Sequence, residues 1–246
     1  FCAALEKTLP EAKVEYRFRI LLNGLAISLP QPDRRTWETL RRLPGVIGVY
    51  PERAYRLALD QSVPLIGAPA LWEVLGGVEH AGEGVKIAIS DTGIYTSNPF
   101  FSPTTFQYPP GFPKGDARYT TPKVIVARAY FRPHDPPAPG EPPTPIDNHG
   151  HGTHVAGIAA GVAGTSTPMG PLSGVAPRAW LMNYKIFYYA RSGGDPVAYT
   201  PEIVASMEDA VADGADVYNG SWGGTADFAP EADPMVLAAE AMVRAG

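Results

Sequence analysis

Little in this sequence of 246 residues points to a disulfide, a membrane or a nucleic acid. Its single cysteine, Cys2, excludes an internal disulfide. No apolar run approaches the roughly 20 residues that a helix needs to cross a bilayer. The net charge of −5 gives no basic excess for binding phosphate backbones. We therefore expect neither a nucleic-acid partner nor a membrane partner.

The N-terminal sequence FCAALEKTLPEAKVEY also lacks a leader pattern, which is a basic segment followed by an apolar one. We expect a protein that is either cytoplasmic or whose leader is absent from this chain. What the sequence does contain is core material, with 45% hydrophobic and 18% charged residues. This composition predicts one large domain and a small additional unit.

The pattern of the chain changes near residue 60. Before it, alternation on both sides of Asn23-Gly24 predicts two strands within residues 15–30. PDRRTWETLRRLPG (32–45) predicts a helix closed by Gly45, and VIGVYPE (46–52) predicts a further strand. Residues before the change therefore form a small α+β unit.

After residue 60, apolar strands alternate with helices. The strands are expected at VKIAIS (85–90), KVIVARAY (123–130), WLMNYKIF (180–187) and ADVYN (215–219). The helices are expected from Gly152 onward, at 200–214 and at 232–246, with Thr200 and Asp233 as N-caps and Gly214 and Gly246 at the C-terminal ends. This alternation predicts an α/β fold with a parallel sheet covered by helices on both faces.

Asp91 directly follows the apolar strand 85–90, in the tripeptide Asp-Thr-Gly. Functional residues of parallel sheets lie just beyond the carboxyl ends of strands, although a lone Asp-Thr-Gly is also compatible with a simple Asx-turn. DNHGHGTHVAGIAAG (147–161) supplies three candidate partners, His149, His151 and His154.

These histidines allow two chemical interpretations. A metal site is disfavoured, because their spacings of two and three residues differ from the i, i+4 pairing of helical zinc ligands. A general base fits better, since His151 has glycine beside it and small residues behind it at an expected helix start. For His149 and His154 we expect imidazoles hydrogen-bonded to nearby backbone.

AISDTGI followed by GHGTHVAGIAAG resembles the two signatures of the subtilisin-like serine proteases, the subtilases. SGVAPRAWLMNYKIF and GADVYNGSWGG resemble two further strands of that family, and the loop 98–131 most resembles extracellular bacterial subtilases that carry a protease-associated domain. The resemblance implies Asp91 and His151 as catalytic residues, in the family's chain order of Asp, His and Ser. It implies serine endopeptidase activity, peptide or protein substrates, no cofactor and a secreted enzyme.

The same resemblance implies two domains. Residues 1–59 resemble the ferredoxin-like subtilase prodomain without its first strand, an intramolecular chaperone and inhibitor, and residues 60–246 resemble the N-terminal part of the peptidase domain. YRLALD (55–60) is then expected to run extended towards residues 221–223, with maturation near Leu57–Asp60. The segment 132–145 is too rich in proline for a helix or an inner strand and is expected to form an extended surface loop, with His134 solvated.

The sequence departs from the family in three ways. The Gly-Thr-Ser-Met-Ala-Ala-Pro motif of the nucleophile and the oxyanion asparagine are not in this chain, so we expect a truncated pro-form that is inactive alone. Phe100 stands where many subtilases have a calcium-binding aspartate, so no such site is predicted. Trp222 replaces a smaller aliphatic residue and makes the substrate wall bulkier.

Ser221 is not expected to be the nucleophile. NGSWGG lacks the first glycine of a nucleophile elbow, and a loop follows it instead of a helix. Ser221, Trp222 and Gly223 are instead expected to bind substrate by strand pairing, or to form an ordinary strand end. Two other functions stay open, namely a non-catalytic peptide-binding subtilase fragment and a metal-dependent hydrolase that uses His149, His151 and His154.

Overall fold

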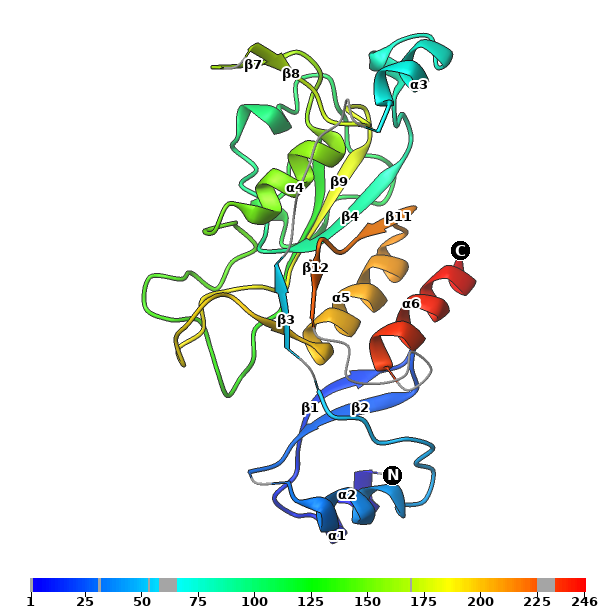
Figure 1. Cartoon of the computed structure of the whole chain (residues 1–246), viewed down its shortest axis with the longest axis vertical. Coiled ribbons are helices and arrows are strands. Elements are labelled where there is room, and N and C mark those ends of the chain that lie inside the picture. Colours follow the sequence, from blue (N-terminus) through cyan, green and yellow to red (C-terminus); the bar gives the residue numbers. More distant parts are fainter. Residues whose placement is uncertain (1, 31, 53, 58–65, 169, 225–232) are drawn as a thin grey trace.

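A parallel five-stranded sheet forms the centre of the computed structural model, which describes residues 2–30, 32–52, 54–57, 66–168, 170–224 and 233–246 (Figure 1). The strand order is β11-β4-β9-β6-β5. The strands are β4 (Lys86–Asp91), β5 (Lys114–Gly115), β6 (Val124–Ala129), β9 (Trp180–Lys185) and β11 (Val217–Asn219). The predicted α/β class is therefore confirmed.

Side chains alternate between the two faces of this sheet. In β4, Ile87 and Ile89 pack in the cluster of helix α4 (His151–Ala160). Ala88 faces the opposite way, into the cluster of α5 (Thr200–Asp213) and α6 (Pro234–Ala245). Burial on both sides explains why these strands are almost continuously apolar. Helices cover both faces, as predicted.

The ends of the two long helices test the predicted caps. Asp233 is the N-cap of α6, where its carboxylate accepts a hydrogen bond from the Met235 N–H. Gly214 ends α5 in the left-handed conformation, with φ of 84°. The Thr200 prediction is wrong, because the N-cap of α5 is Tyr199 and Thr200 is already helical. Tyr199 is held in extended conformation by pairing with Ala54, so the helix begins one residue later.

The first part of the chain, here called the N-terminal unit (described residues up to Leu57), has a small core of its own. Its elements are α1 (Cys2–Thr8), β1 (Lys13–Phe18), β2 (Gly24–Ser28), α2 (Arg34–Arg41) and β3 (Ala54–Leu57). Strands β1 and β2 form the predicted antiparallel pair. Leu5, Leu40 and Leu43 fill the space between the helices and the hairpin.

The strand predicted at residues 46–52 is wrong. These residues form neither helix nor strand. Val46 and Val49 pack against the small core, whereas Ile47 is fully exposed. The alternation that suggested a strand therefore reflects one-sided packing of an irregular segment, and the extended pairing comes later, in β3.

The β1–β2 hairpin packs against the two long helices of the main unit (described residues 66–246), as Figure 1 shows. Phe18 and Leu21 share one apolar cluster with Met207 of α5 and Met235 of α6. The buried Glu208 carboxylate accepts hydrogen bonds through Oε1 from the backbone N–H groups of residues 19, 20 and 21, at 3.2, 3.1 and 3.0 Å. The hairpin loop is thus built around a side chain of α5.

A second, three-stranded sheet joins the two units. Its order is β10-β3-β12, with β10 (Ala198–Tyr199) and β12 (Trp222–Gly223) both antiparallel to β3. The N-terminal unit supplies only the middle strand. Its last described residues therefore occupy a slot between two strands of the main unit, here called the β10–β12 slot; Figure 1 shows β3 beside β12.

The proline-rich segment 132–145 lies partly on the surface, as predicted, but two of its charged residues are buried. Glu141 accepts a hydrogen bond from Lys185 Nζ at 2.5 Å, and both side chains are almost fully buried. Arg132 is buried too. His134 is exposed, as predicted, and its Nδ1 lies 3.6 Å from Glu15 Oε1 of the N-terminal unit. The loop is therefore attached to the rest of the protein through Arg132 and Glu141, whose burial the proline-rich composition did not predict.

Short elements complete the described chain. They are α3 (Ala68–Val74), the 3-10 turns η1 (Val78–His80), η2 (Pro99–Phe101) and η3 (Ala117–Tyr119), and the hairpin of β7 (Thr165–Thr167) and β8 (Gly170–Leu172). Within the described ranges, no helix combines the length and the apolar character required to span a bilayer.

Candidate active site

The carboxyl end of β4 places Asp91 in a fully buried position at the edge of the sheet. The chain then turns away at Gly93, whose φ of 107° is rarely adopted by residues with a side chain. A Cβ atom at Gly93 would lie 2.5 Å from the Pro145 carbonyl oxygen. Glycine is therefore required here both for the turn and for the close approach of the loop that precedes α4.

His151 is the first residue of α4, and its Nδ1 lies 2.8 Å from Asp91 Oδ1. This distance is within the range of about 2.6–3.2 Å expected for a hydrogen bond between a general base and its orienting carboxylate. Gly152 makes the approach possible, since a Cβ there would collide with the Gly93 carbonyl oxygen and lie 3.0 Å from Asp91 Oδ1. The glycine beside His151 thus serves the contact between helix and turn.

The remaining atoms of the pair define what it can do chemically. Asp91 Oδ1 also accepts a hydrogen bond from the Thr92 N–H, at 2.7 Å. Among the described residues, neither Asp91 Oδ2 nor His151 Nε2 has a hydrogen-bond partner. A carboxylate that holds the Nδ1 proton leaves Nε2 as the proton acceptor. The arrangement is therefore that of a general base whose tautomer is set by Asp91.

Asp147 organises the start of α4, a role that the sequence analysis did not identify. Its Oδ1 accepts hydrogen bonds from the N–H groups of His149 and Gly150, and its Oδ2 accepts from the Thr153 N–H. Thr153 Oγ1 also donates to Oδ2. An aspartate three residues before a glycine N-cap is a typical turn signal that was available in the sequence.

These hydrogen bonds affect the ionisation of Asp147. Burial by itself raises the pKa of Asp147, but the hydrogen bonds from Thr153, Gly150 and His149 outweigh it and hold the pKa below its ordinary value. The charged form is thus the one that the fold stabilises. Asp147 contributes stability above its unfolded pKa of about 3.9, and this contribution is lost as the pH falls through the folded pKa.

Asp147→Asn is expected to lower the free energy of unfolding by about 1.5 kcal/mol at pH 7, because an amide nitrogen would face the Thr153 donors. The deficit relative to wild type should begin to shrink as the pH falls below about 4, where the carboxylate protonates in the unfolded state, and should disappear as the pH falls through the lower pKa of the folded state. Urea unfolding at several pH values measures it, with the exposed Asp195→Asn as the control. A deficit that stays constant down to pH 2 would contradict the assigned role.

The other two histidines of the cluster do not join the pair. The His149 ring centroid lies 6.3 Å from that of His151, and both His149 and His154 are exposed. The predicted hydrogen bonds from their imidazoles to backbone are not present in the described chain, where both side chains face solvent. The same residues include no group of three His, Cys, Asp or Glu side chains placed to hold a metal ion.

The predicted substrate-binding residues lie at the β10–β12 slot. Trp222 pairs with Leu57 and Gly223 with Arg56, so the predicted extended path towards residues 221–223 is confirmed as far as Leu57. Residues 58–60, where maturation was predicted, lie outside the described residues. Ser221 Oγ accepts a hydrogen bond from Asn219 Nδ2 at 2.9 Å. The Trp222 indole donates to the Ser90 carbonyl oxygen, which ties the slot to the strand that ends in Asp91.

The sequence profile of the subtilase family matches residues 82–243, about two thirds of the chain, and covers both Asp91 and His151. The chain belongs to the subtilase family. The family match therefore agrees with the resemblance that the motifs indicated.

Curated relatives come from plants and bacteria. Subtilisin-like protease SBT2.2 of Arabidopsis thaliana is 33% identical over 230 residues, which cover 82% of this chain and 25% of the relative. Subtilisin-like protease SBT1.4 of the same plant is 34% identical over 218 residues, with 78% and 26% covered. Minor extracellular protease Vpr of Bacillus subtilis (strain 168) is 30% identical over 234 residues, with 88% and 25% covered. This subtilase chain thus spans about a quarter of the length of these relatives.

Two parts of the site in this subtilase were not found from the sequence. Strand β10 forms the second wall of the slot, but its two residues, Ala198 and Tyr199, have no periodic pattern that marks a strand. Arg132 lies close to that wall, with its guanidinium carbon 3.6 Å from the Tyr199 ring centroid. Its position in a proline-rich segment gave no signal of burial.

Proposed function

We propose that the full-length protein is a secreted subtilisin-like serine endopeptidase in which His151 is the general base and Asp91 orients it. The observation that carries this proposal is the 2.8 Å contact between His151 Nδ1 and Asp91 Oδ1, which leaves Nε2 ready to accept a proton. In the reaction, His151 takes the proton of a serine hydroxyl and later donates it to the leaving amine. The nucleophile and the oxyanion asparagine come from outside the sequence of residues 1–246.

Substrates are proposed to be peptide segments in extended conformation. The two-sided pairing of β3 with β10 and β12 supports this mode, since main-chain hydrogen bonds on both sides hold a strand of almost any sequence. Ser221, Trp222 and Gly223 line one wall. The indole of Trp222 is fixed by its hydrogen bond to the Ser90 carbonyl oxygen, so this wall is proposed to be rigid and bulky.

The N-terminal unit is proposed to be a prodomain that acts as chaperone and inhibitor. Two observations support it: β3 fills the slot where a substrate strand would lie, and the hairpin loop is bound by Glu208 of α5. Maturation is proposed near Leu57–Asp60. Secretion is supported by the similarity to a relative named as an extracellular protease.

Hydrolysis of an unfolded protein by the full-length protein tests the proposed activity. We expect cleavage that a serine-directed phosphonate abolishes, whereas residues 1–246 alone should neither cleave peptides nor react with the phosphonate. Binding of extended peptides without cleavage by the full-length protein would favour a non-catalytic peptide-binding role. Zinc in stoichiometric amount, or labelling of Ser221 by the phosphonate, would count against the assignment.

A further inference from the structure

Arg132 is a buried cation beside the β10–β12 slot, and side chains of the main unit hold one edge of its guanidinium. Its Nε donates to Glu202 Oε1 at 2.8 Å, and its NH2 group donates to Oε2 at 3.3 Å. The guanidinium lies over the Tyr199 ring, and the Arg132 backbone N–H donates to the Tyr188 hydroxyl. All four residues belong to the main unit, so these contacts can persist when another peptide takes the place of β3.

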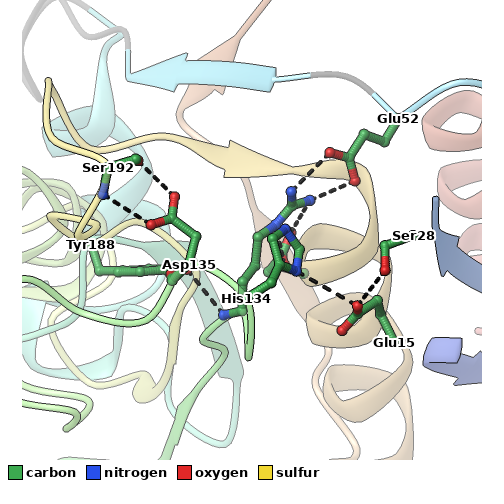
Figure 2. A network of polar contacts seen from close by, with 9 residues as sticks. Glu15, Ser28, Glu52, His134, Asp135, Tyr188 and Ser192 are labelled. Atoms are coloured by element: carbon green, nitrogen blue, oxygen red, sulfur yellow. Dashed lines mark hydrogen bonds and ion pairs between the residues drawn. The ribbon is translucent and has the colours of Figure 1, made fainter. Parts of the chain in front are cut away.

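The other edge of the guanidinium binds the N-terminal unit. NH1 donates to Glu52 Oε1 at 2.8 Å, and NH2 donates to Glu52 Oε2 at 2.6 Å. This is a two-point, fork-to-carboxylate contact, the geometry that arginine offers and lysine does not. Figure 2 shows Glu52 and Glu15 on the side of the N-terminal unit, with His134 between them and Tyr188, Asp135 and Ser192.

Glu52 stands at a fixed place relative to the strand in the slot. Leu57 pairs with Trp222, and Glu52 comes five residues before Leu57. Tyr55 and Ala54 pair with β10, which leads directly into the helix that carries Glu202. A peptide that takes the place of β3 in the same register therefore brings its fifth residue before the Trp222 partner to the free edge of Arg132.

From this juxtaposition we propose that Arg132 forms a substrate subsite for a carboxylate side chain, five residues before the residue that pairs with Trp222. The proposal rests on the proposed peptidase function and adds a substrate class to it: extended segments with Asp or Glu at that position. In this structure Glu52, two residues before β3, occupies the subsite. The pairing of β3 thus shows the register in which a peptide would fill the subsite.

The charges around Arg132 set the expected strength of this subsite. Glu202 is 1% exposed and already pairs with one edge of the guanidinium, so a second carboxylate adds a negative charge to the group. Glu52 is 45% exposed, which leaves it partly hydrated and screens its repulsion from Glu202. The partial exposure of Glu52 also limits the binding free energy that its ion pair with Arg132 contributes. We expect a preference of about tenfold for a carboxylate over its amide.

Peptide binding to the full-length protein tests the subsite. The protein is folded with its N-terminal unit, cut at a protease site engineered between Leu57 and Ile66, and freed of that unit. Fluorescence anisotropy then compares PERAYRL (residues 51–57) with the same peptide carrying Glu52→Gln. We expect about tenfold weaker binding of the amide peptide. A peptide with Pro51→Glu and Glu52→Gln keeps the charge one position away and should bind as weakly as the amide peptide.

A variant of the protein provides the second arm. Arg132→Lys keeps the cation opposite Glu202 but loses the fork, so its preference for glutamate over glutamine should fall to about twofold or less. The peptide comparison in the wild-type protein decides the question even if this variant does not fold. Equal binding of the glutamate peptide and the amide peptide, or no binding of either, overturns the subsite.

Binding and hydrolysis fail separately in this design. A protein that prefers the glutamate peptide but never cleaves an unfolded protein contradicts the proposed function and supports the subsite. A protein that cleaves the unfolded protein but binds both peptides equally supports the function and overturns the subsite.

Discussion

His151→Ala in the full-length protein is expected to lower kcat for peptide hydrolysis by about 10⁵- to 10⁶-fold. The reason is that base, nucleophile and orienting carboxylate of such a triad act as a unit, so removal of the base stops the chemistry while substrate binding continues. KM should change little, because the His151 ring contacts Asp91, whereas the substrate is proposed to bind through main-chain pairing with β10 and β12. Steady-state kinetics on an unfolded protein or a chromogenic peptide measures both quantities.

Two further variants show whether the effect belongs to the pair. Asp91→Asn is expected to lower kcat by about 10⁴-fold, since an amide cannot hold the same imidazole tautomer. His149→Ala is the matched control: it removes an exposed imidazole 6.3 Å from that of His151 and should leave kcat within about threefold of wild type. If the loss at His149 equalled that at His151, the assignment of the base would be wrong.

Glu208→Ala is expected to loosen the attachment of the N-terminal unit by about 100-fold. The carboxylate accepts hydrogen bonds from the four successive backbone N–H groups of residues 19–22 in the hairpin loop, and these donors would lose their partner in the interface. Hydrogen bonds to a charged acceptor contribute about 1.5–3 kcal/mol, and a loss of about 2.7 kcal/mol corresponds to 100-fold. Amide hydrogen exchange at Arg19, Ile20 and Leu21 reports the change directly.

Two controls separate this contact from a general loss of stability. Glu208→Gln keeps one accepting oxygen without the charge and should show an intermediate acceleration of exchange. Glu240→Gln alters an exposed carboxylate of α6 that pairs with Arg244, and it should leave the amides of Arg19, Ile20 and Leu21 unchanged. Unaltered exchange of these amides in Glu208→Ala would show that apolar packing of Phe18 and Leu21 alone holds the hairpin.

Local patterns in the sequence were sufficient to predict the central sheet and the Asp91–His151 pair. The apolar runs at 85–90 and 180–187 became β4 and β9 because a strand buried on both faces is a nearly continuous apolar run in sequence. Asp91 and His151 could be paired because each occupies a defined place, a strand end and a helix start. Both signals involve neighbouring residues only.

The parts that failed depend on contacts between distant segments. Strand β10 has only two residues, and its partner β3 lies more than 140 residues earlier in the chain. No periodicity in so short a segment predicts pairing. The segment 46–52 failed for the opposite reason, since it has a strand-like pattern but no neighbouring strand. The burial of Arg132 could not be predicted from the sequence, because its partners, Glu52 and Glu202, lie 80 and 70 residues away.

The middle position of β3 has a consequence for aggregation. Without β3, the main unit would present two strand edges, each only two residues long, which pair with successive halves of β3 from opposite sides. Long bare edges template the pairing of one molecule with another, but edges this short give too few hydrogen bonds for such a contact to last. A single inserted segment gains hydrogen bonds on both sides at once. The slot can therefore remain accessible to extended peptide segments, while edge-to-edge strand pairing with a second copy of the protein stays weak.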